Sequence, residues 1–208
     1  MTRFIERDYS RAALEALCQE GFAPALARAL AARGVVSAAE LRADWRSMLA
    51  PNSLPGACTA ARLLADAIEK QKRIMIIADY DCDGATACAV AIRGLRAMGA
   101  IVDYLVPDRF VYGYGLTPAI VDLAATHKPD IILTVDNGMA SIDGVARARA
   151  LGIETIITDH HLPADELPQA ACIVNPNAPG CLFGSKNLAG VGVCLLYTSP
   201  SPRDRSLS

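Results

Sequence analysis

The sequence predicts an α/β fold in which a parallel sheet carries helices on both faces and follows a small helical N-terminal region. Short apolar runs rich in β-branched residues alternate with helical segments, which is typical of parallel sheets. Four of these runs end directly in carboxylate, imidazole or amide side chains. The 208 residues, 52% of them hydrophobic, suffice for one buried core and a smaller appendage.

Residues 1–58 are predicted to form helices and turns. Residues 10–19 have a helical pattern, and Pro24 can occupy the first position of a second helix. Residues 37–40 match a capping box. A loop over 51–56, rich in proline and glycine, marks the expected boundary, and we assign no chemistry to the region before it.

Residues 59–196 are predicted to form the main domain, in which strands and helices alternate as in a parallel, doubly covered sheet. The segment 107–115 is predicted to be a Gly-rich loop. The expected strands are 74–78, 101–106, 131–135, 153–158 and 171–174, and the expected helices are 59–71, 85–98, 117–126, 141–151 and 188–196.

Residues 197–208 break this alternation. They are polar, contain prolines and lack periodicity, so they are predicted to be disordered. Because they interrupt a helix that begins near residue 188, we expect them to be a non-native tail.

The composition excludes several classes of protein. The 22 acidic and 20 basic residues give a net charge of −2, which excludes a globally basic nucleic-acid coat but not a local basic groove. Seven scattered cysteines without a Cys-x-x-Cys pair predict reduced thiols and a cytoplasmic protein. No run approaches 18 apolar residues, so no membrane span is expected.

Acidic side chains gather after the predicted strands. Asp79, Asp81 and Asp83 follow the first strand at alternate positions, and Asp136 follows the strand over 131–135. The carboxyl ends of parallel strands form the crevice in which open α/β sheets bind ligands. Two like charges about 4 Å apart repel by roughly 4 kcal/mol at an effective dielectric near 20, so protons or cations must neutralise the cluster. Carboxylates with imidazoles suit Mn²⁺ or Mg²⁺, and two ions sharing aspartates are expected.

Several of these residues also have an ordinary structural interpretation. Asp136 lies in Asp-Asn-Gly, which is turn chemistry. His160 and His161 are adjacent, so in an extended chain they would point in opposite directions and only one would bind metal. Arg109 and Tyr114 belong either to a plain surface loop or to a substrate site for phosphate and base. The glycines of 190–192 indicate either anion binding at a helix start or tight packing.

Three motifs resemble those of the DHH phosphoesterase family: Asp-Tyr-Asp-Cys-Asp-Gly over 79–84, Val-Asp-Asn-Gly over 135–138 and Asp-His-His over 159–161. Within that family, segments 106–116 and 188–193 and the Val-Asn-Pro-Asn of 174–177 resemble the branch of single-strand-specific 5′→3′ DNA exonucleases. The resemblance runs from about residue 70 to 195.

The resemblance implies a two-metal (Mn²⁺ or Mg²⁺) hydrolase of single-stranded DNA in repair and recombination, with helicase or single-strand-binding proteins as partners. It places metal ligands at Asp79, Asp81, Asp83, Asp136 and His160, and substrate contacts at Arg109, Tyr114 and His161. Except for Asp79, the ligands also count as catalytic, as does His161. Family members are longer and carry a further ligand aspartate and a second domain, so we expect an N-terminal fragment with weak or no activity.

Two other functions fit the same motifs. One is another phosphoesterase of the family, such as an oligoribonuclease, a cyclic-dinucleotide phosphodiesterase or a pyrophosphatase. The other is a non-catalytic replication scaffold with the same fold. A scaffold is expected to have lost metal ligands, whereas every motif position is filled in this sequence.

Overall fold

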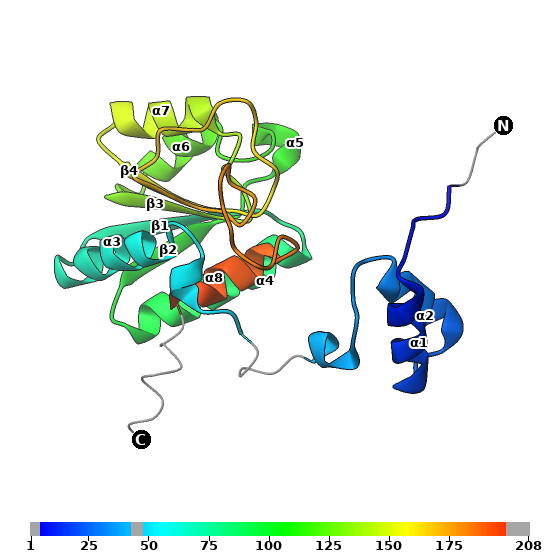
Figure 1. Cartoon of the computed structure of the whole chain (residues 1–208). Coiled ribbons are helices and arrows are strands. Elements are labelled where there is room, and N and C mark those ends of the chain that lie inside the picture. Colours follow the sequence, from blue (N-terminus) through cyan, green and yellow to red (C-terminus); the bar gives the residue numbers. More distant parts are fainter. Residues whose placement is uncertain (1–4, 43–47, 199–208) are drawn as a thin grey trace, which may run out of the picture. The chain divides into compact units, whose positions relative to one another are not determined.

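The computed structural model describes residues 5–42 and 48–198 (Figure 1). The chain forms two compact units, Met1–Met48 and Leu49–Ser208. Each unit has its own set of helices, and we describe them separately.

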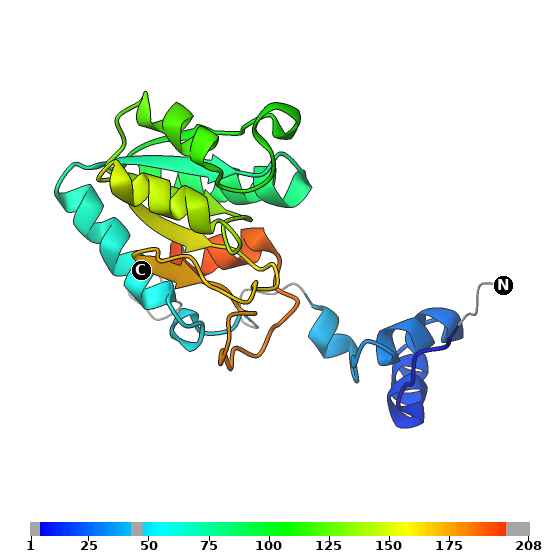
Figure 2. The same cartoon turned by 90° about the horizontal axis from the view of Figure 1, so that it is seen from above.

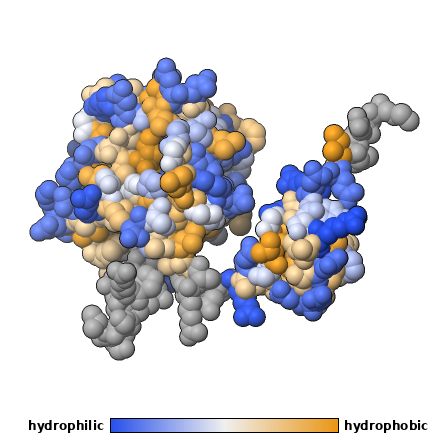
Figure 3. Space-filling view, in the orientation of Figure 1, coloured by the Kyte–Doolittle hydropathy of each residue, from blue (hydrophilic) through white to orange (hydrophobic). Residues whose placement is uncertain are grey.

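The smaller unit contains α1 (Arg11–Gln19), α2 (Pro24–Ala31) and the 3₁₀ turn η1 (Ala38–Leu41). The Ser10 side chain caps α1 by accepting from the amide of Ala13 at 3.3 Å, and the predicted capping box closes η1. Leu17 is fully buried, and small residues on α1 and α2 complete the core around it. On the face shown in Figure 3, apolar residues of this unit are bordered by hydrophilic ones. The small helical N-terminal region predicted from the sequence is therefore confirmed.

The larger unit begins earlier than residue 59. The 3₁₀ turn η3 (Pro51–Ser53) leads into Leu54, which is buried. Gly56 has φ 84°, and a Cβ there would lie 2.2 Å from the carbonyl oxygen of Ile173. Because this stretch packs against the last strand of the sheet, it belongs to the larger unit, although the sequence suggested a linker.

Five parallel strands form the sheet, in the order β2-β1-β3-β4-β5, which confirms the predicted α/β class. Their bounds are β1 Arg73–Ala78, β2 Ile101–Leu105, β3 Ile131–Val135, β4 Glu154–Thr158 and β5 Cys172–Val174. Ala78 pairs with Val135, and Val135 pairs with Thr158. The carboxyl ends of β1, β3 and β4 are therefore level, so the residues that follow them start from one line.

Helices cover both faces of the sheet (Figures 1 and 2). On one face lie α3 (Ala57–Glu69), α4 (Cys82–Ala97) and α8 (Gly190–Thr198), with α4 packed against α8, β1 and β2. On the other lie α6 (Pro118–Ala125) and α7 (Ile142–Ala150). Met75 and Ile77 of β1 join the buried cluster beneath α6 and α7, while Ile74 and Ile76 alternate to the opposite face.

Helix α4 begins at Cys82, whereas the sequence pattern predicted a start at Ala85. Asp81 is its N-cap, since its Oδ1 accepts from the amide of Gly84 at 2.9 Å. Asp83 therefore lies in the first helical turn, so the three aspartates, although they alternate in the sequence, do not lie along one extended segment.

The loop expected over 107–115 contains the four-residue helix α5 (Arg109–Tyr112). Asp108 caps it by accepting from the amide of Phe110 at 2.9 Å. The two glycines that follow α5, Gly113 and Gly115, have φ values of 79° and 74°, and they turn the chain towards α6.

Helix α8 extends to Thr198, so Tyr197 and Thr198 are helical and do not belong to a disordered tail. Tyr197 is buried, and its hydroxyl has polar partners there: Thr158 Oγ1 at 3.3 Å and Cys194 Sγ at 3.0 Å. The rest of the predicted tail, 199–208, lies outside the described residues. Within 5–42 and 48–198, no helix has the length and apolar character needed to cross a bilayer.

Candidate metal centre

The strand order creates a crevice between β1 and β3. The chain leaves β1 through α4 towards β2, and leaves β3 through α7 towards β4, which lie on opposite sides of that pair. Ligands of open α/β sheets bind at such a switch point, outside the carboxyl ends of the strands. Asp79 follows β1, Asp136 follows β3 and Asp159 follows β4, so all three begin at this edge.

Asp136 is held in a strained and crowded position. Its backbone has φ 62°, and the side chain of Asn137 fixes the turn by donating to the carbonyls of Ile77 at 3.1 Å and Val135 at 2.9 Å. A Cβ on Gly190 would lie 2.6 Å from Asp136 Oδ1, so only glycine fits there. Only 1% of Asp136 is exposed. The turn therefore presents a carboxylate that is almost completely removed from water.

The charge on Asp136 is unbalanced. Within the described residues its Oδ1 has no hydrogen-bond partner. Burial, reinforced by the negative charges of Asp83 and Asp81, raises the pKa of Asp136 from 3.8 to about 7. A divalent cation would remove both the repulsion and the unmet bonding of this oxygen.

Both histidines face this carboxylate. His160 Nε2 lies 3.1 Å from Asp136 Oδ1 and 3.4 Å from Asp83 Oδ2. One ligand atom each from Asp136, His160 and His161 lies within 4.8 Å of the others. The two imidazole rings are 4.8 Å apart between centroids, so the expectation that they point in opposite directions is wrong. Asp159 Oδ1 accepts from the amides of His160 at 2.7 Å and His161 at 3.1 Å, which makes this segment a turn and not an extended chain.

Asp83 reaches the centre from α4 and is anchored to α8. Its two oxygens accept from the amides of Gly190 at 2.7 Å and Val191 at 2.9 Å. The positive end of a helix stabilises such a carboxylate. The amides of the Gly-Val-Gly segment are thus used by a side chain of the protein itself, and close packing on Asp136 accounts for the first glycine.

Asp79 has a different environment from Asp83 and Asp136. Arg109 Nη2 donates to both of its oxygens, at 3.1 Å and 3.2 Å. The Arg109 guanidinium carbon lies 3.8 Å from the ring centroid of Tyr80 and 5.4 Å from that of Tyr114. The structure thus places Tyr114 between Arg109 and His161, and pairs Asp79 with Arg109.

Asp159 orients His161, a role that the sequence analysis did not assign. The residue is buried, its Oδ2 accepts from the amide of Met139 at 2.9 Å, and its Oδ1 lies 2.7 Å from His161 Nδ1. A carboxylate only accepts, so Nδ1 carries the proton, and in the neutral ring Nε2 can accept from the hydroxyl of Tyr114, 3.3 Å away. Burial alone would lower the pKa of His161, but the hydrogen bond and charge of Asp159 raise it.

Two asparagines after β5 hold the histidine turn from the other side. Asn175 Nδ2 donates to the carbonyl of His161 at 2.9 Å, and Asn177 Nδ2 donates to that of His160 at 2.6 Å. Their position directly after a buried strand was the only sequence signal for this role. The asparagines hold the backbone of the two histidines, and Asp159 holds the His161 ring, so the turn that carries both imidazoles is fixed.

The donor set fits a hard divalent cation. Carboxylate oxygens with one or two imidazoles are the ligands that Mn²⁺ and Mg²⁺ accept, whereas thiolates would favour softer metals. The unpartnered oxygen and raised pKa of Asp136 are the signs of such a site. Asp136, His160 and His161, with Asp83 beside them, form a group of side chains that could hold such a cation.

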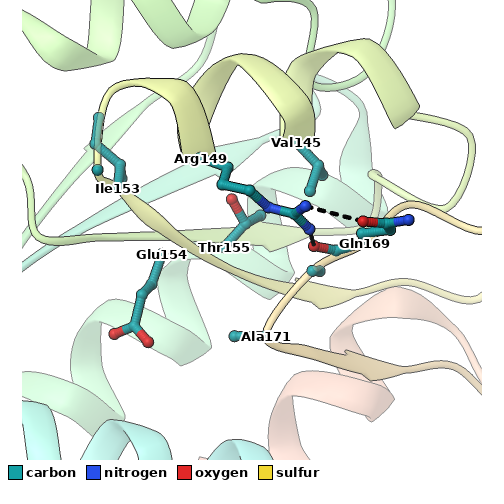
Figure 4. Close-up of a pocket in the computed structure, with 9 residues that line it drawn as sticks. Val145, Arg149, Ile153, Glu154, Thr155, Gln169 and Ala171 are labelled. Carbon is teal, nitrogen blue, oxygen red and sulfur yellow. Dashed lines mark hydrogen bonds between the residues drawn. The ribbon is translucent and has the colours of Figure 1, made fainter.

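A cavity of about 420 Å³ lies at the opposite edge of the sheet, at the amino ends of β4 and β5 (Figure 4). Arg149 donates there to the side chain of Gln169 at 2.9 Å and to its carbonyl at 2.6 Å. These bonds tie α7 to the segment before β5. The cavity lies at the edge of the sheet opposite the carboxylates, so it is not the candidate site.

The profile of the "DHH family, N-terminal domain" matches residues 73–204, so this chain belongs to the DHH family. It is similar to proteins named "Single-stranded-DNA-specific exonuclease RecJ": 49% identical over 171 residues to that of Salmonella typhimurium and 48% over 171 residues to that of Escherichia coli. Each match covers 82% of this chain and 30% of the relative. The chain thus spans about a third of the length of these curated relatives.

Solved structures agree with this family. The "Crystal structure of exonuclease RecJ bound to manganese" matches with a TM-score of 0.66 and 36% identity, covering 72% of this chain and 38% of that one. The crystal structure of RecJ in complex with Mn²⁺ from Thermus thermophilus matches with a TM-score of 0.66 and 31% identity, covering 90% of this chain and 26% of that one. The chain therefore has the fold of the corresponding part of these structures.

Proposed function

We propose that this chain forms the catalytic core of a metal-dependent phosphodiester hydrolase that digests single-stranded DNA from the 5′ end. The observation that carries the proposal is the convergence of Asp83, Asp136 and His160 on one point, where Asp136 Oδ1 accepts no hydrogen bond from the described residues. The names of the similar RecJ proteins supply the substrate class, and their structures with Mn²⁺ or Mg²⁺ supply the metals.

The residues have distinct roles in this proposal. Asp81, Asp83, Asp136 and His160 would hold two Mn²⁺ or Mg²⁺ ions. When bound, the ions supply Lewis acidity that makes water a nucleophile at neutral pH and offsets the charge of the phosphate. His161, oriented by Asp159, would present Nε2 to the substrate side, and its protonated form would donate a hydrogen bond to a phosphate oxygen or pass that proton to the leaving group.

Substrate selection falls to the rim. Arg109 would grip a phosphate, since a guanidinium matches phosphate oxygens, and Tyr114 would stack on a base. Helicase and single-strand-binding proteins of DNA repair and recombination are the proposed partners. These assignments account for an aromatic pair and an arginine gathered beside an acidic centre.

Calorimetric titration with Mn²⁺ tests the metal centre, with Asp136→Asn as the comparison. We expect binding by the unmodified chain and its loss in the variant. A single-turnover assay with protein in excess over a 5′-labelled single-stranded oligonucleotide then tests the chemistry, because slow turnover is expected of this chain. Mononucleotide release that needs Mn²⁺ and stops in Asp136→Asn would support the proposal.

The same assay separates the competing functions. Duplex DNA, a short oligoribonucleotide and pyrophosphate are offered under identical conditions. Faster cleavage of RNA or pyrophosphate would assign the chain to another phosphoesterase class of the family. Absence of Mn²⁺ binding would indicate a non-catalytic scaffold.

A further inference from the structure

Asp79 differs from the other carboxylates of the centre in what neutralises it. Its side chain is only 9% exposed, and both of its oxygens accept from Arg109 Nη2. Oδ1 also accepts from the amide of Tyr80 at 2.8 Å. Asp136, by contrast, keeps an oxygen that accepts no hydrogen bond from the described residues and has only the His160 imidazole nearby, at 3.1 Å. A cation is therefore needed to balance Asp136 and is already provided, by Arg109, for Asp79.

The position of Asp79 is fixed from behind. A Cβ on Gly84 would lie 2.5 Å from the carbonyl oxygen of Asp79, so the first turn of α4 packs directly on this residue. The carboxylate is consequently a rigid point at the end of β1. Arg109 lies thirty positions further along the chain, in the short helix α5, and this ion pair fastens α5 to the sheet.

Arg109 is held in place but keeps donors to spare. Its guanidinium stacks on Tyr80 and lies near Tyr114, while the ion pair engages Nη2. A guanidinium has five N–H donors, the ion pair uses only those of Nη2, and 36% of the Arg109 side chain is exposed. Such a group is oriented by the protein and still able to bind an anion.

We propose that Asp79 is a positioning residue that aims Arg109 at a substrate phosphate, and that it is not a ligand of the metal ions. The inference rests on the proposed function, and it changes one assignment that the family resemblance implies. The ion pair with Asp79 and the ring of Tyr80 hold the guanidinium 5.4 Å from the ring centroid of Tyr114, whose hydroxyl lies 3.3 Å from His161 Nε2. Metal binding and phosphate binding are thereby assigned to different aspartates of the same Asp-x-Asp-x-Asp motif.

If Asp79 acted only through its charge, removing its carboxylate would have the opposite effect on DNA affinity from the one that a positioning role predicts. Removing a carboxylate from a site that binds polyanions should strengthen DNA binding. A positioning role predicts weaker binding, because Arg109 loses its orientation. The experiment measures affinity for a fluorescent 5′-phosphorylated single-stranded oligonucleotide by anisotropy, with Ca²⁺ in place of Mn²⁺, and separately the Mn²⁺ affinity by calorimetry.

We expect Asp79→Ala to weaken oligonucleotide binding about 10-fold while changing Mn²⁺ affinity less than about 3-fold. Asp79→Asn keeps one acceptor oxygen, so its oligonucleotide affinity should lie between those of the unmodified chain and of Asp79→Ala. Arg109→Gln should weaken oligonucleotide binding to a similar degree, and the double variant Asp79→Ala/Arg109→Gln should be no weaker than Arg109→Gln alone. Asp122→Asn, which breaks the exposed ion pair with Arg147, serves as the control and should change neither affinity.

Loss of Mn²⁺ binding in Asp79→Ala, with oligonucleotide binding kept, would overturn the inference and make Asp79 a ligand. Tighter oligonucleotide binding, or additive effects of the two substitutions, would also overturn it. A parallel loss of both affinities would show a purely structural role. Failure of the unmodified chain to bind Mn²⁺ or the oligonucleotide would instead refute the proposed function, so the two failures are distinguishable.

Discussion

Charged side chains are paired or hydrogen-bonded at one edge of the sheet and crowded with like charges at the other. At the amino edge, Lys72 pairs with Glu154 at 3.3 Å and Asp130 accepts from the amide of Arg73 at 2.8 Å. At the carboxyl edge, Asp136 is surrounded by other aspartates and its pKa rises to about 7. The cavity of about 420 Å³ lies at the balanced edge. Unbalanced charge therefore distinguishes the candidate site from the cavity at the amino edge.

Substitution of Asp136 should change the carboxyl edge more than any other single change. Asp136→Asn removes a buried carboxylate without changing its shape. We expect Mn²⁺ affinity to fall more than about 100-fold, since a direct ligand matters more than the orienting residues behind it. The metal-free protein should gain about 1–3 kcal/mol in its free energy of unfolding, because the unbalanced charge is gone. Calorimetry and urea denaturation without metal measure the two effects.

Asp130→Asn is the matched control at the amino edge. The substitution weakens a satisfied contact to Arg73, so it should lower the free energy of unfolding by about 0.5–1.5 kcal/mol and leave Mn²⁺ affinity unchanged. Opposite signs of the stability change at the two edges are the expected result. A loss of stability in both variants would contradict the unbalanced charge assigned to Asp136.

The pH dependence should follow the same residue. The folded protein keeps Asp136 protonated from pH 3.8, the ordinary value, up to about 7, so it binds more protons than the unfolded chain over that interval. The free energy of unfolding of the metal-free protein should therefore fall as the pH rises through this range, by about 2–4 kcal/mol. His161, whose pKa is also raised, contributes in the same direction.

Mn²⁺ affinity should change in the reverse sense, rising as the pH increases towards about 7, because the metal must displace the proton of Asp136. Denaturation and calorimetry at pH 4, 5, 6, 7 and 8 measure both trends from near the ordinary pKa of Asp136, 3.8, to above the raised one, about 7. In Asp136→Asn the fall in stability should be reduced to the contribution of other groups. A stability that rises steadily with pH in the metal-free protein would refute the raised pKa.

The sequence predicted the carboxyl edge well and its internal pairing poorly. Apolar runs located the strands, and polar residues directly after them located the edge. The contacts of Asp79 with Arg109 and of Asp83 with Gly190 join residues far apart in the chain, and no local pattern encodes them. Helix α4 starts earlier than predicted because Asp81 caps it. An aspartate can serve as a helix cap or as a metal ligand, and the sequence pattern did not distinguish the two roles.

The same limit applies to the histidine turn. Adjacent residues in an extended chain point apart, but Asp159 accepts from both histidine amides and bends the segment. Tyr197 was assigned to the tail from composition, yet its hydroxyl finds buried partners on β4 and α8. In each case a side chain folding back on the backbone or a distant partner overrode the local signal.

Two glycines, one at each edge of the sheet, should give smaller effects on stability and Mn²⁺ affinity when substituted. Gly190→Ala would push a Cβ to 2.6 Å from Asp136 Oδ1, so we expect a loss of about 2–3 kcal/mol in stability and about 10-fold in Mn²⁺ affinity. Gly152 lies at the other edge, where a Cβ would meet no described atom within 4 Å but φ is 75°. Gly152→Ala should cost only the backbone strain, about 1 kcal/mol, and leave Mn²⁺ affinity unchanged. Equal effects on the metal would show that Gly190 acts through general destabilisation.

The smallest expected effect concerns the cavity at the amino edge. Thr155 lines it, and its hydroxyl is buried without a hydrogen-bond partner in the part of the chain that the structure describes. Thr155→Val keeps the shape and removes that hydroxyl, so stability should rise by up to about 1 kcal/mol and Mn²⁺ affinity should stay the same. Both are measured as for Asp136→Asn. A loss of more than about 1 kcal/mol would mean that the hydroxyl is engaged, because removing an unpaired polar group cannot cost stability on that scale. The amino edge would then hold a polar site of its own, and the contrast between the two edges would no longer rest on charge balance alone.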